Sequence, residues 1–149
     1  MTAEDDPHDL DRFRLAQNDC FLQALAEIRA GRKKSHWMWY IFPQFDGLGF
    51  SPTSKRYAIK STAEARAYLR HPVLGARLKQ CCEALVAGNE RSAANVFGSP
   101  DDMKLRSCAT LFAAVSPPGS LFEQVLNRFF DGVPDEHTIR LLLAAAAAE

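Results

Sequence analysis

The residues best suited to chemistry gather in one segment of the chain, residues 31–44. Three consecutive basic residues, Arg32–Lys34, are followed by a histidine, His36, and by both tryptophans of the sequence, Trp37 and Trp39. His36 is the strongest candidate for acid–base chemistry, because imidazole exchanges protons close to neutral pH. A tryptophan ring can stack on a nucleobase or another flat ring, and Lys34 can hold an anion beside it. The alternative is purely structural, since tryptophans are core residues first and a histidine often only packs or caps.

A glycine-rich turn follows, and it leads into a helix that starts with proline. The turn and the first helical residues cover residues 47–54. The N-terminus of a helix presents unpaired N–H groups and a partial positive charge, and therefore attracts anions. Ser51 and Ser54 add hydroxyl donors, while Gln44 and Tyr57 flank the turn. We expect these side chains to help bind a phosphate or carboxylate, the alternative being that Ser51 only caps the helix.

Three polar residues farther along are spaced to share one face of a helix: Asp101, Lys104 and Ser107. If that face lines the same cleft as His36, Asp101 could orient the imidazole or act as a base, and Lys104 could hold a ligand anion. The alternative is an ion pair on a solvated face. We therefore predict catalytic roles for His36 and Asp101. The predicted ligand-binding residues are Lys34, Trp37, Trp39, Gln44, Ser51, Ser54, Tyr57, Arg77 and Lys104.

Several kinds of site are excluded by spacing. The histidines show neither the H-x-x-x-H nor the H-E-x-x-H pattern, and the four cysteines show no C-x-x-C pair, so we predict no metal site. The sequence has no P-loop, no Rossmann fingerprint and no G-x-S-x-G serine, and we predict no cofactor. Cysteines without a paired framework indicate free buried thiols in a reducing compartment, which predicts the cytoplasm.

The charge is balanced overall but unevenly spread. Residues 1–11 hold five acids and no lysine or arginine, which leaves 13 acids against 18 bases in the rest. This excess of bases suits an anionic ligand but is too small to favour nucleic acid as a partner. No apolar run is long enough for a membrane span, so we predict no membrane association. The oligomeric state is open.

Residues that typically cap or end helices recur along the whole chain, so we predict an all-α fold. An acidic, partly flexible leader (residues 1–9) precedes a single compact domain (residues 10–149) of about seven to nine helices. The predicted helices cover residues 10–30, 36–42, 52–59, 62–70, 72–87, 92–97, 100–115, 121–131 and 136–147. Expected N-caps are Asp9 or Asp11, Ser35, Ser61, Ser99, Ser120 and Asp135. Gly31 is expected to end the first helix, because glycine adopts a left-handed backbone without steric cost. Residues 37–42 could instead form a short buried strand, since so short an apolar run has no diagnostic period.

The arrangement of these motifs resembles a known family. The resemblance rests on residues 31–44, Gly47-Leu48-Gly49, Ser51, Ser54, Tyr57, Tyr68-Leu69-x-His71-Pro72-x-Leu74-Gly75-x-Arg77-Leu78, Phe97-Gly98, Asp101, Lys104, Ser107, Thr110-Leu111-Phe112, Phe130-x-Gly132 and Asp135. The resemblance covers nearly the whole chain. By these residues the sequence is similar to the uncharacterised bacterial family called domain of unknown function 1810, some members of which carry the label calpastatin. The resemblance implies a compact all-α domain and no established activity. Calpain inhibition does not fit, because that label belongs to long disordered inhibitors and this chain is apolar and compact.

Two functions follow as hypotheses. The first is binding of, or action on, a small anionic ligand that is phosphorylated or nucleotide-like, with the Trp-rich segment and the turn after it forming one pocket. The second is a non-catalytic module that binds protein or nucleic acid through the basic shoulder Arg32–Lys34. The first requires the polar groups to converge in a hollow, and the second requires them to spread over a convex face.

Overall fold

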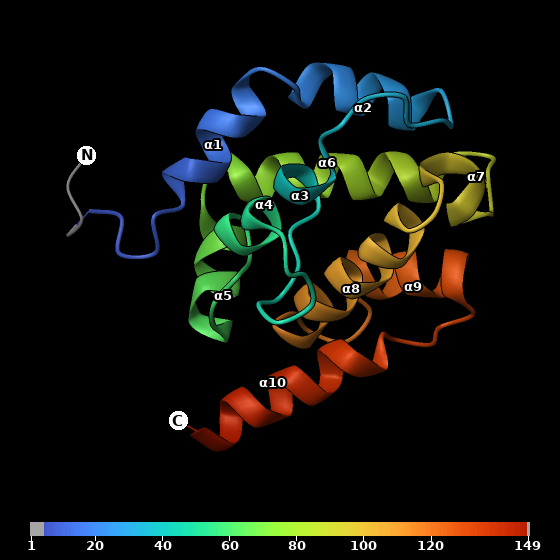
Figure 1. Cartoon of the computed structure of the whole chain (residues 1–149). Helices are drawn as coiled ribbons and strands as arrows, with labels where there is room; N and C mark the ends of the chain where they lie inside the picture. The colour runs from blue at the N-terminus through green and yellow to red at the C-terminus, as the bar shows by residue number, and fades with distance from the viewer. Residues whose placement is uncertain (1–4, 149) are drawn as a thin grey trace.

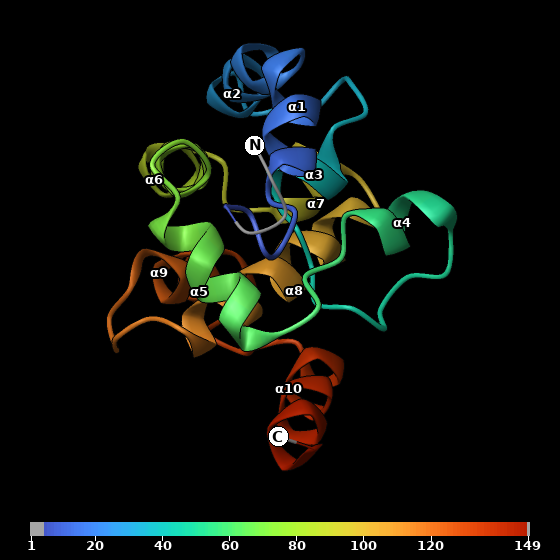
Figure 2. The same cartoon turned by 90° about the vertical axis from the view of Figure 1, so that its left-hand side faces the viewer.

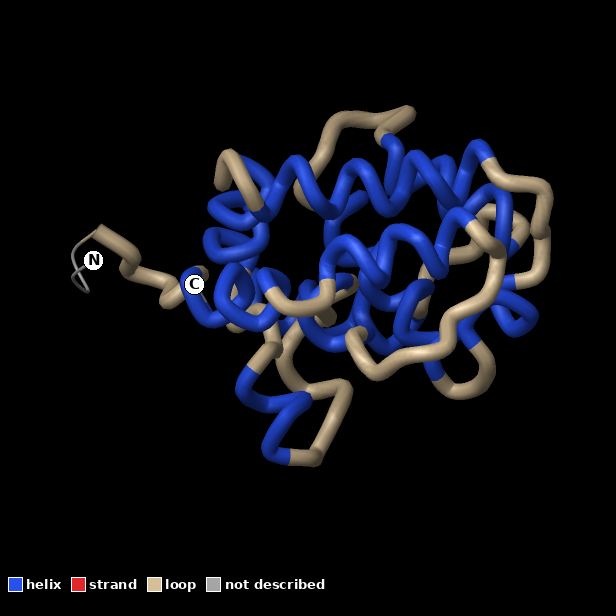
Figure 3. Tube along the Cα trace, turned by 90° about the horizontal axis from the view of Figure 1, so that it is seen from above, coloured by secondary structure: helices blue, strands red, loops and turns tan. Residues whose placement is uncertain are grey.

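Helices supply all the regular secondary structure of this protein. The computed structural model describes residues 5–148, and within them it has ten helices and no strand. Figures 1 and 3 show how the helices are arranged. The helices are α1 (Asp11–Asn18), α2 (Phe21–Arg29), α3 (Met38–Ile41), α4 (Pro52–Arg56), α5 (Thr62–Arg70), α6 (Leu74–Ala87), α7 (Ala93–Phe97), α8 (Asp101–Ala114), α9 (Leu121–Phe130) and α10 (Glu136–Ala148). The predicted all-α class is confirmed. None of the helices within residues 5–148 is long and apolar enough to cross a membrane.

Helices α6 and α8 lie in the middle of the molecule. Helix α6 packs against α2, α5 and α9, and α8 packs against α7, α9 and α10. In Figure 1, α2 lies along the top of α6, and α10 lies below α8. Their buried side chains make one hydrophobic cluster that extends from Leu10 to Leu142. Aromatic rings fill its centre, and Trp37 and Tyr68 are its largest fully buried members.

The predicted first helix, residues 10–30, is two helices. Helix α1 ends at Asn18 and α2 begins at Phe21, because Cys20 leaves helical geometry with a φ of −134°. The side chain of Asp6, and not that of Asp9 or Asp11, accepts hydrogen bonds at the start of α1. This division raises the number of helices above the predicted range.

Gly31 ends α2 as predicted. Its φ is +79°, and Arg32 N donates to Glu27 O while Gly31 N donates to Ile28 O. These two bonds are the Schellman arrangement, which satisfies carbonyls that the helix leaves unpaired. The turn points the next residues back toward the core, so that Trp37 becomes buried.

Half of the predicted caps are correct. Ser61, Ser120 and Asp135 each accept a hydrogen bond from the backbone N–H three residues later, at 3.0, 3.3 and 2.9 Å. Ser99 is not a cap, because Pro100 occupies the cap position of α8 and has no side chain that can bond. Ser35 is not a cap either, since α3 begins at Met38 and the Ser35 hydroxyl donates to Glu27 instead.

Two short segments differ from their predictions in length. Residues 37–42 form a helix and not a strand, but α3 covers only residues 38–41. The helix predicted over residues 52–59 stops at Arg56, because Ile59 pairs with Phe45 in an isolated β-bridge. The bridge lies at the base of a segment, residues 45–56, which we call the arm.

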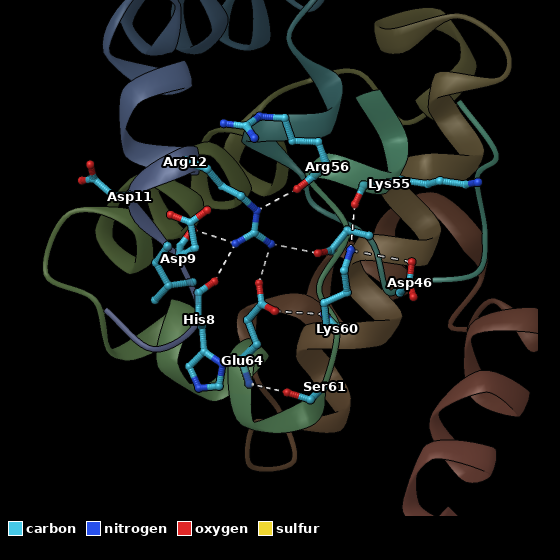
Figure 4. Close-up of polar contacts among 12 residues, drawn as sticks. His8, Asp9, Asp11, Arg12, Asp46, Lys55, Arg56, Lys60, Ser61 and Glu64 are labelled. Carbon is cyan, nitrogen blue, oxygen red and sulfur yellow. Dashed lines mark hydrogen bonds and ion pairs between the residues drawn. The ribbon is translucent and has the colours of Figure 1, made fainter. Parts of the chain in front are cut away.

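A buried arginine joins the N-terminal segment to the end of the arm. Arg12 donates to the carbonyls of His8, Asp9, Arg56 and Ala58 and to the carboxylate of Glu64, at 2.6–2.9 Å (Figure 4). All five N–H donors of its guanidinium are therefore used. Removing either partner of such a buried ion pair costs about 3–5 kcal/mol, because the other charge stays buried and unpaired. Of the predicted flexible leader, residues 5–9 adjoin this cluster and residues 1–4 lie outside the described part of the chain.

Candidate functional site

An open pocket of about 430 Å³ lies between the arm and the first turns of α8 and α10. Figure 2 shows α4 and the loop before it projecting to one side of the helix bundle. The pocket thus brings together segments that are far apart in the sequence. It is lined by Trp39, Gln44, Leu48, Gly49, Phe50, Ser51, Ser54, Pro100, Met103, Lys104, Ser107, Asp135 and His137. Five of the residues predicted to bind ligand are among them: Trp39, Gln44, Ser51, Ser54 and Lys104.

The most unusual contact in this pocket joins Lys104 of α8 to Trp39 of α3. The Lys104 ammonium lies 3.8 Å from the centroid of the Trp39 ring, within the range of a cation–π interaction. It also donates to Asp101 Oδ1 at 3.0 Å. An ammonium has three N–H donors, so Lys104 keeps donors for a bound anion. The Lys104 side chain is 19% exposed, which leaves it reachable from the pocket.

Asp101 holds Lys104 in place and does not have the properties of a general base. Its second oxygen accepts from Lys33 Nζ at 3.0 Å, so the carboxylate bridges two lysines. Burial by itself would raise the pKa of Asp101, but the hydrogen bonds from Lys33 and Lys104 outweigh burial and lower it. A carboxylate with a lowered pKa is a weak proton acceptor. The predicted role of Asp101 as a base is therefore replaced by that of an anchor.

The two serines of the turn are engaged in capping α4. Ser51 Oγ accepts from Ser54 N at 3.1 Å, and the Ser54 hydroxyl donates to Ser51 O at 2.9 Å. Helix α4 has five residues, and Lys55 N already donates to Ser51 O. The backbone and hydroxyl donors of Ser54 are thus used within the turn, and the anion cradle at this N-terminus stays a prediction. Both serines still contribute polar surface to the pocket wall.

The comparisons with known proteins place these residues in a family. The sequence pattern of the family described as "Protein of unknown function (DUF1810)" matches residues 7–142. The chain belongs to this family. The resemblance noted from the Trp-rich segment and its neighbours is thereby confirmed.

A solved structure supports the fold of this family member. Over 92% of its length the chain is similar to the conserved hypothetical protein Rv1873 from Mycobacterium tuberculosis, known from a crystal structure. The two are 44% identical, the TM-score is 0.89, and 98% of that chain is covered. No curated protein matches the chain. The function of this family member is therefore inferred from the chemistry of the pocket.

Two of the predicted aromatic ligands contribute to the packing of the family member, because Trp37 lies in its core and Tyr57 is half-buried against that core. Trp37 is fully buried, and its Nε1 donates to Glu27 Oε1 at 3.0 Å. Tyr57 packs edge-on against Tyr40, with ring centroids 4.9 Å apart. Trp37 was a wrong choice as a stacking platform, because neither face of a fully buried ring can meet a ligand. Of the two tryptophans, Trp39 is the one that lines the pocket.

Three predicted polar residues lie outside the pocket. His36 is exposed and forms no hydrogen bond or ion pair with Asp101 within residues 5–148, where Asp101 pairs with Lys33 and Lys104 instead. Lys34 is exposed, while its backbone N donates to Glu27. Arg77 packs over the Phe21 ring, with 5.0 Å to the centroid, on the α1–α2 side of α6.

Several pocket residues were not among the predicted ligand-binding residues, including Leu48, Phe50, Met103, Asp135 and His137. Phe50 carried a usable signal, since a phenylalanine within a glycine–serine turn has no helix face to bury it. It is 85% exposed. Met103 precedes Lys104 and lies one turn before Ser107, so it shares part of the predicted polar face. His137 carried no signal, because only tertiary packing brings α10 to the arm.

Within residues 5–148 no cluster of three His, Cys, Asp or Glu side chains could hold a metal ion.

The basic shoulder does not form one outward patch. Arg32 and Lys34 are exposed, but Lys33 turns inward, with its side chain 9% exposed and bound to Asp101. The Lys33 ammonium lies 5.2 Å from the Trp37 ring centroid. One of the three bases therefore supports the pocket wall from behind and cannot serve a convex binding face.

Proposed function

We propose that this protein binds a small molecule that combines a flat ring with an anionic group, in the pocket between the arm, α8 and α10. The observation that carries the proposal is the position of Lys104, which is held by Asp101 over the face of Trp39 and borders an open hollow. A cation and a half-buried aromatic ring side by side suit a ligand with the same two features. The pocket volume of about 430 Å³ lies in the range of small-molecule sites.

The preorganisation of Lys104 supports the proposal. A lysine side chain loses conformational entropy when it is fixed, and here Asp101 and Trp39 fix it before any ligand arrives. A ligand anion would then bind without ordering the lysine, which favours affinity. Behind Asp101, Lys33 balances the carboxylate, so that the charge of Lys104 is not fully neutralised.

The first prediction concerns Lys104. Lys104→Met keeps the length of the side chain and removes its charge, and it should weaken binding of an anionic ring compound about tenfold or more, which corresponds to about 1.4 kcal/mol. Binding is measured by calorimetry and by thermal shift with a panel of nucleotides and aromatic acids. Lys34→Met is the matched control, because Lys34 is an exposed lysine outside the pocket, and it should bind like the unaltered protein.

Nuclear magnetic resonance supplies an internal control. The two tryptophans give two indole N–H signals, and only Trp39 lines the pocket, so a ligand should shift the Trp39 signal and leave that of Trp37 in place. The proposal is wrong if no compound shifts the Trp39 signal. Binding that Lys34→Met abolishes, and that falls steeply with salt, would point instead to the basic shoulder.

A further inference from the structure

The ionisable groups around the pocket are few, and their signs nearly cancel. Of the lining residues, only Lys104, Asp135 and His137 have ionisable side chains. Asp101 lies directly behind Lys104 and bears a negative charge. A ligand in this pocket therefore meets the ammonium of Lys104, the imidazole of His137 and the carboxylate of Asp135, while the charges of Asp101 and Lys33 behind the ammonium offset each other. Such surroundings balance a single negative charge and repel a second one.

Backbone N–H groups at the starts of α8 and α10 are used in hydrogen bonds within the chain. At the start of α8, Asp102 N donates to Gly98 O and Met103 N donates to Pro100 O. At the start of α10, Thr138 N donates to the carboxylate of Asp135. Phosphate sites in proteins usually draw on such free N–H groups or on several cations. The starts of α8 and α10 therefore offer few free N–H groups, and the basic side chains among the lining residues are Lys104 and His137.

Beside the polar side chains of Gln44, Ser51, Ser54 and Ser107, the wall has an apolar part that is open to solvent. Phe50 is 85% exposed and Met103 is 42% exposed, and both line the pocket beside Trp39 and Leu48. Apolar surface of this kind gains free energy when a ligand covers it. The body of the ligand must therefore be apolar, in contrast to the sugar and phosphates of a nucleotide.

From these observations we infer that the ligand is an aromatic carboxylate, a flat apolar ring system that carries one carboxylate group, and not a phosphorylated compound. The carboxylate pairs with Lys104, and the ring lies among Trp39, Phe50 and Met103. This inference rests on the proposed function and narrows its ligand class. A phosphate monoester carries about two negative charges, and the second charge would face Asp135 without a partner.

Three compounds with the same ring test the inference: indoleacetate, indoleacetamide and indoxyl phosphate. Calorimetry on the whole protein gives each affinity, and the Trp39 indole N–H signal reports where each compound binds. We expect indoleacetate to bind about tenfold more tightly than either of the other two, the typical worth of a charge-assisted hydrogen bond. In Lys104→Met the difference between acetate and acetamide should disappear.

A second variant tests the role of charge in the wall. Asp135→Asn removes the negative charge but keeps an oxygen that can accept from Thr138 N, because asparagine is also a good N-cap. We expect this variant to improve the binding of indoxyl phosphate several-fold relative to indoleacetate. An unchanged ratio of the two affinities would contradict the argument from Asp135.

The outcomes separate this inference from the proposed function. If indoxyl phosphate or a nucleoside monophosphate binds at Trp39 more tightly than indoleacetate, the aromatic carboxylate is the wrong class and the proposed function stands. If none of these compounds and none of the wider panel shifts the Trp39 signal, both fail. If indoleacetamide binds as tightly as indoleacetate, Lys104 does not recognise the carboxylate and the inference is overturned.

Discussion

At the scale of single residues, two carboxylates organise the Trp-rich segment. Asp101 bridges Lys33 and Lys104, and so fixes the cation of the pocket. Glu27 holds the turn before α3, because it accepts from Lys34 N, from Ser35 N and Oγ, and from Trp37 Nε1 at 2.7–3.0 Å. The segment 31–39 therefore takes its conformation from buried acids on other elements. The bases of this segment are thus held by two acids that lie outside it, Glu27 and Asp101.

The prediction at this scale concerns acid stability. Burial by itself would raise the pKa of Glu27, but the hydrogen bonds from Lys34, Ser35 and Trp37 overcome it and lower the pKa to about 2, from an ordinary value of 4.5. When the folded-state pKa is the lower one, the carboxylate stabilises the fold above pH 4.5, and this contribution is lost as the pH falls from 4.5 toward 2. Its size is on the order of 2 kcal/mol.

Glu27→Gln should therefore lower the free energy of unfolding by about 2 kcal/mol at neutral pH, and the deficit should shrink in acid. Urea unfolding at a series of pH values, for the unaltered protein and the variant, measures this difference. Glu83→Gln, at an exposed position of α6, serves as the control and should change little. A constant deficit between pH 7 and pH 3 would contradict the assignment.

At the scale of elements, α5 and α6 meet at a contact that only glycine permits. A Cβ built on Gly75 would lie 2.1 Å from the backbone carbonyl oxygen of Leu69. Because a backbone atom cannot turn aside as a side chain can, the two helices would have to separate. The motif that contains His71 and Gly75 is thus a tight helix junction, and His71 Nδ1 accepts from the backbone of Val73 and Leu74 at its centre.

Gly75→Ala should destabilise the protein although alanine is the better helix former. Helix propensity would contribute about 1 kcal/mol in favour of the variant, and we expect the clash to exceed this and leave a net loss of about 2 kcal/mol. The midpoint of chemical unfolding measures the change. Lys79→Ala, on an exposed part of the same helix, is the comparison and should stay within about 0.5 kcal/mol. A Gly75→Ala variant that is as stable as the unaltered protein would show that the junction can relax.

At the scale of the whole molecule, one continuous core encloses the thiols. Cys81, Cys82 and Cys108 are buried in that core, and burial raises the pKa of Cys81 to about 12 and the pKa values of Cys82 and Cys108 well above the ordinary value. A thiol with a raised pKa carries almost no thiolate at neutral pH, and the thiolate is the reactive form. Cys20 is half-buried, and burial raises its pKa as well.

These thiols should react with a disulfide reagent only when the core opens. In the native protein we expect slow reaction of Cys20 and protection of the other three cysteines, whereas all four should react at once in denaturant. Absorbance of the released thiolate and mass spectrometry of peptides follow the reaction. Cys20→Ser should remove the only reaction seen under native conditions. Rapid native labelling of Cys81 would mean that α6 opens without global unfolding.

The sequence by itself determined most of the helical framework. Caps such as Ser61 and Asp135, and the stop at Gly31, depend on hydrogen bonds between residues three to five positions apart, so they can be read locally. The break at Cys20 was missed because the apolar stripe of residues 10–30 continues across it, although Asn18, Asp19 and Cys20 are weak helix formers. A different limit applies to Ser99, whose role depended on where α8 begins.

Only the tertiary structure decided which chemical groups share a pocket. The spacing of Asp101 and Lys104 indicated one helix face, but whether that face meets Trp39 or His36 depends on how α8 docks against the arm. Trp37 and Trp39 are two residues apart and look alike in the sequence, yet Glu27 buries one and the pocket exposes the other. The reason is physical: capping is a local interaction, whereas a site consists of contacts between distant segments, and the packing of the whole core selects those contacts.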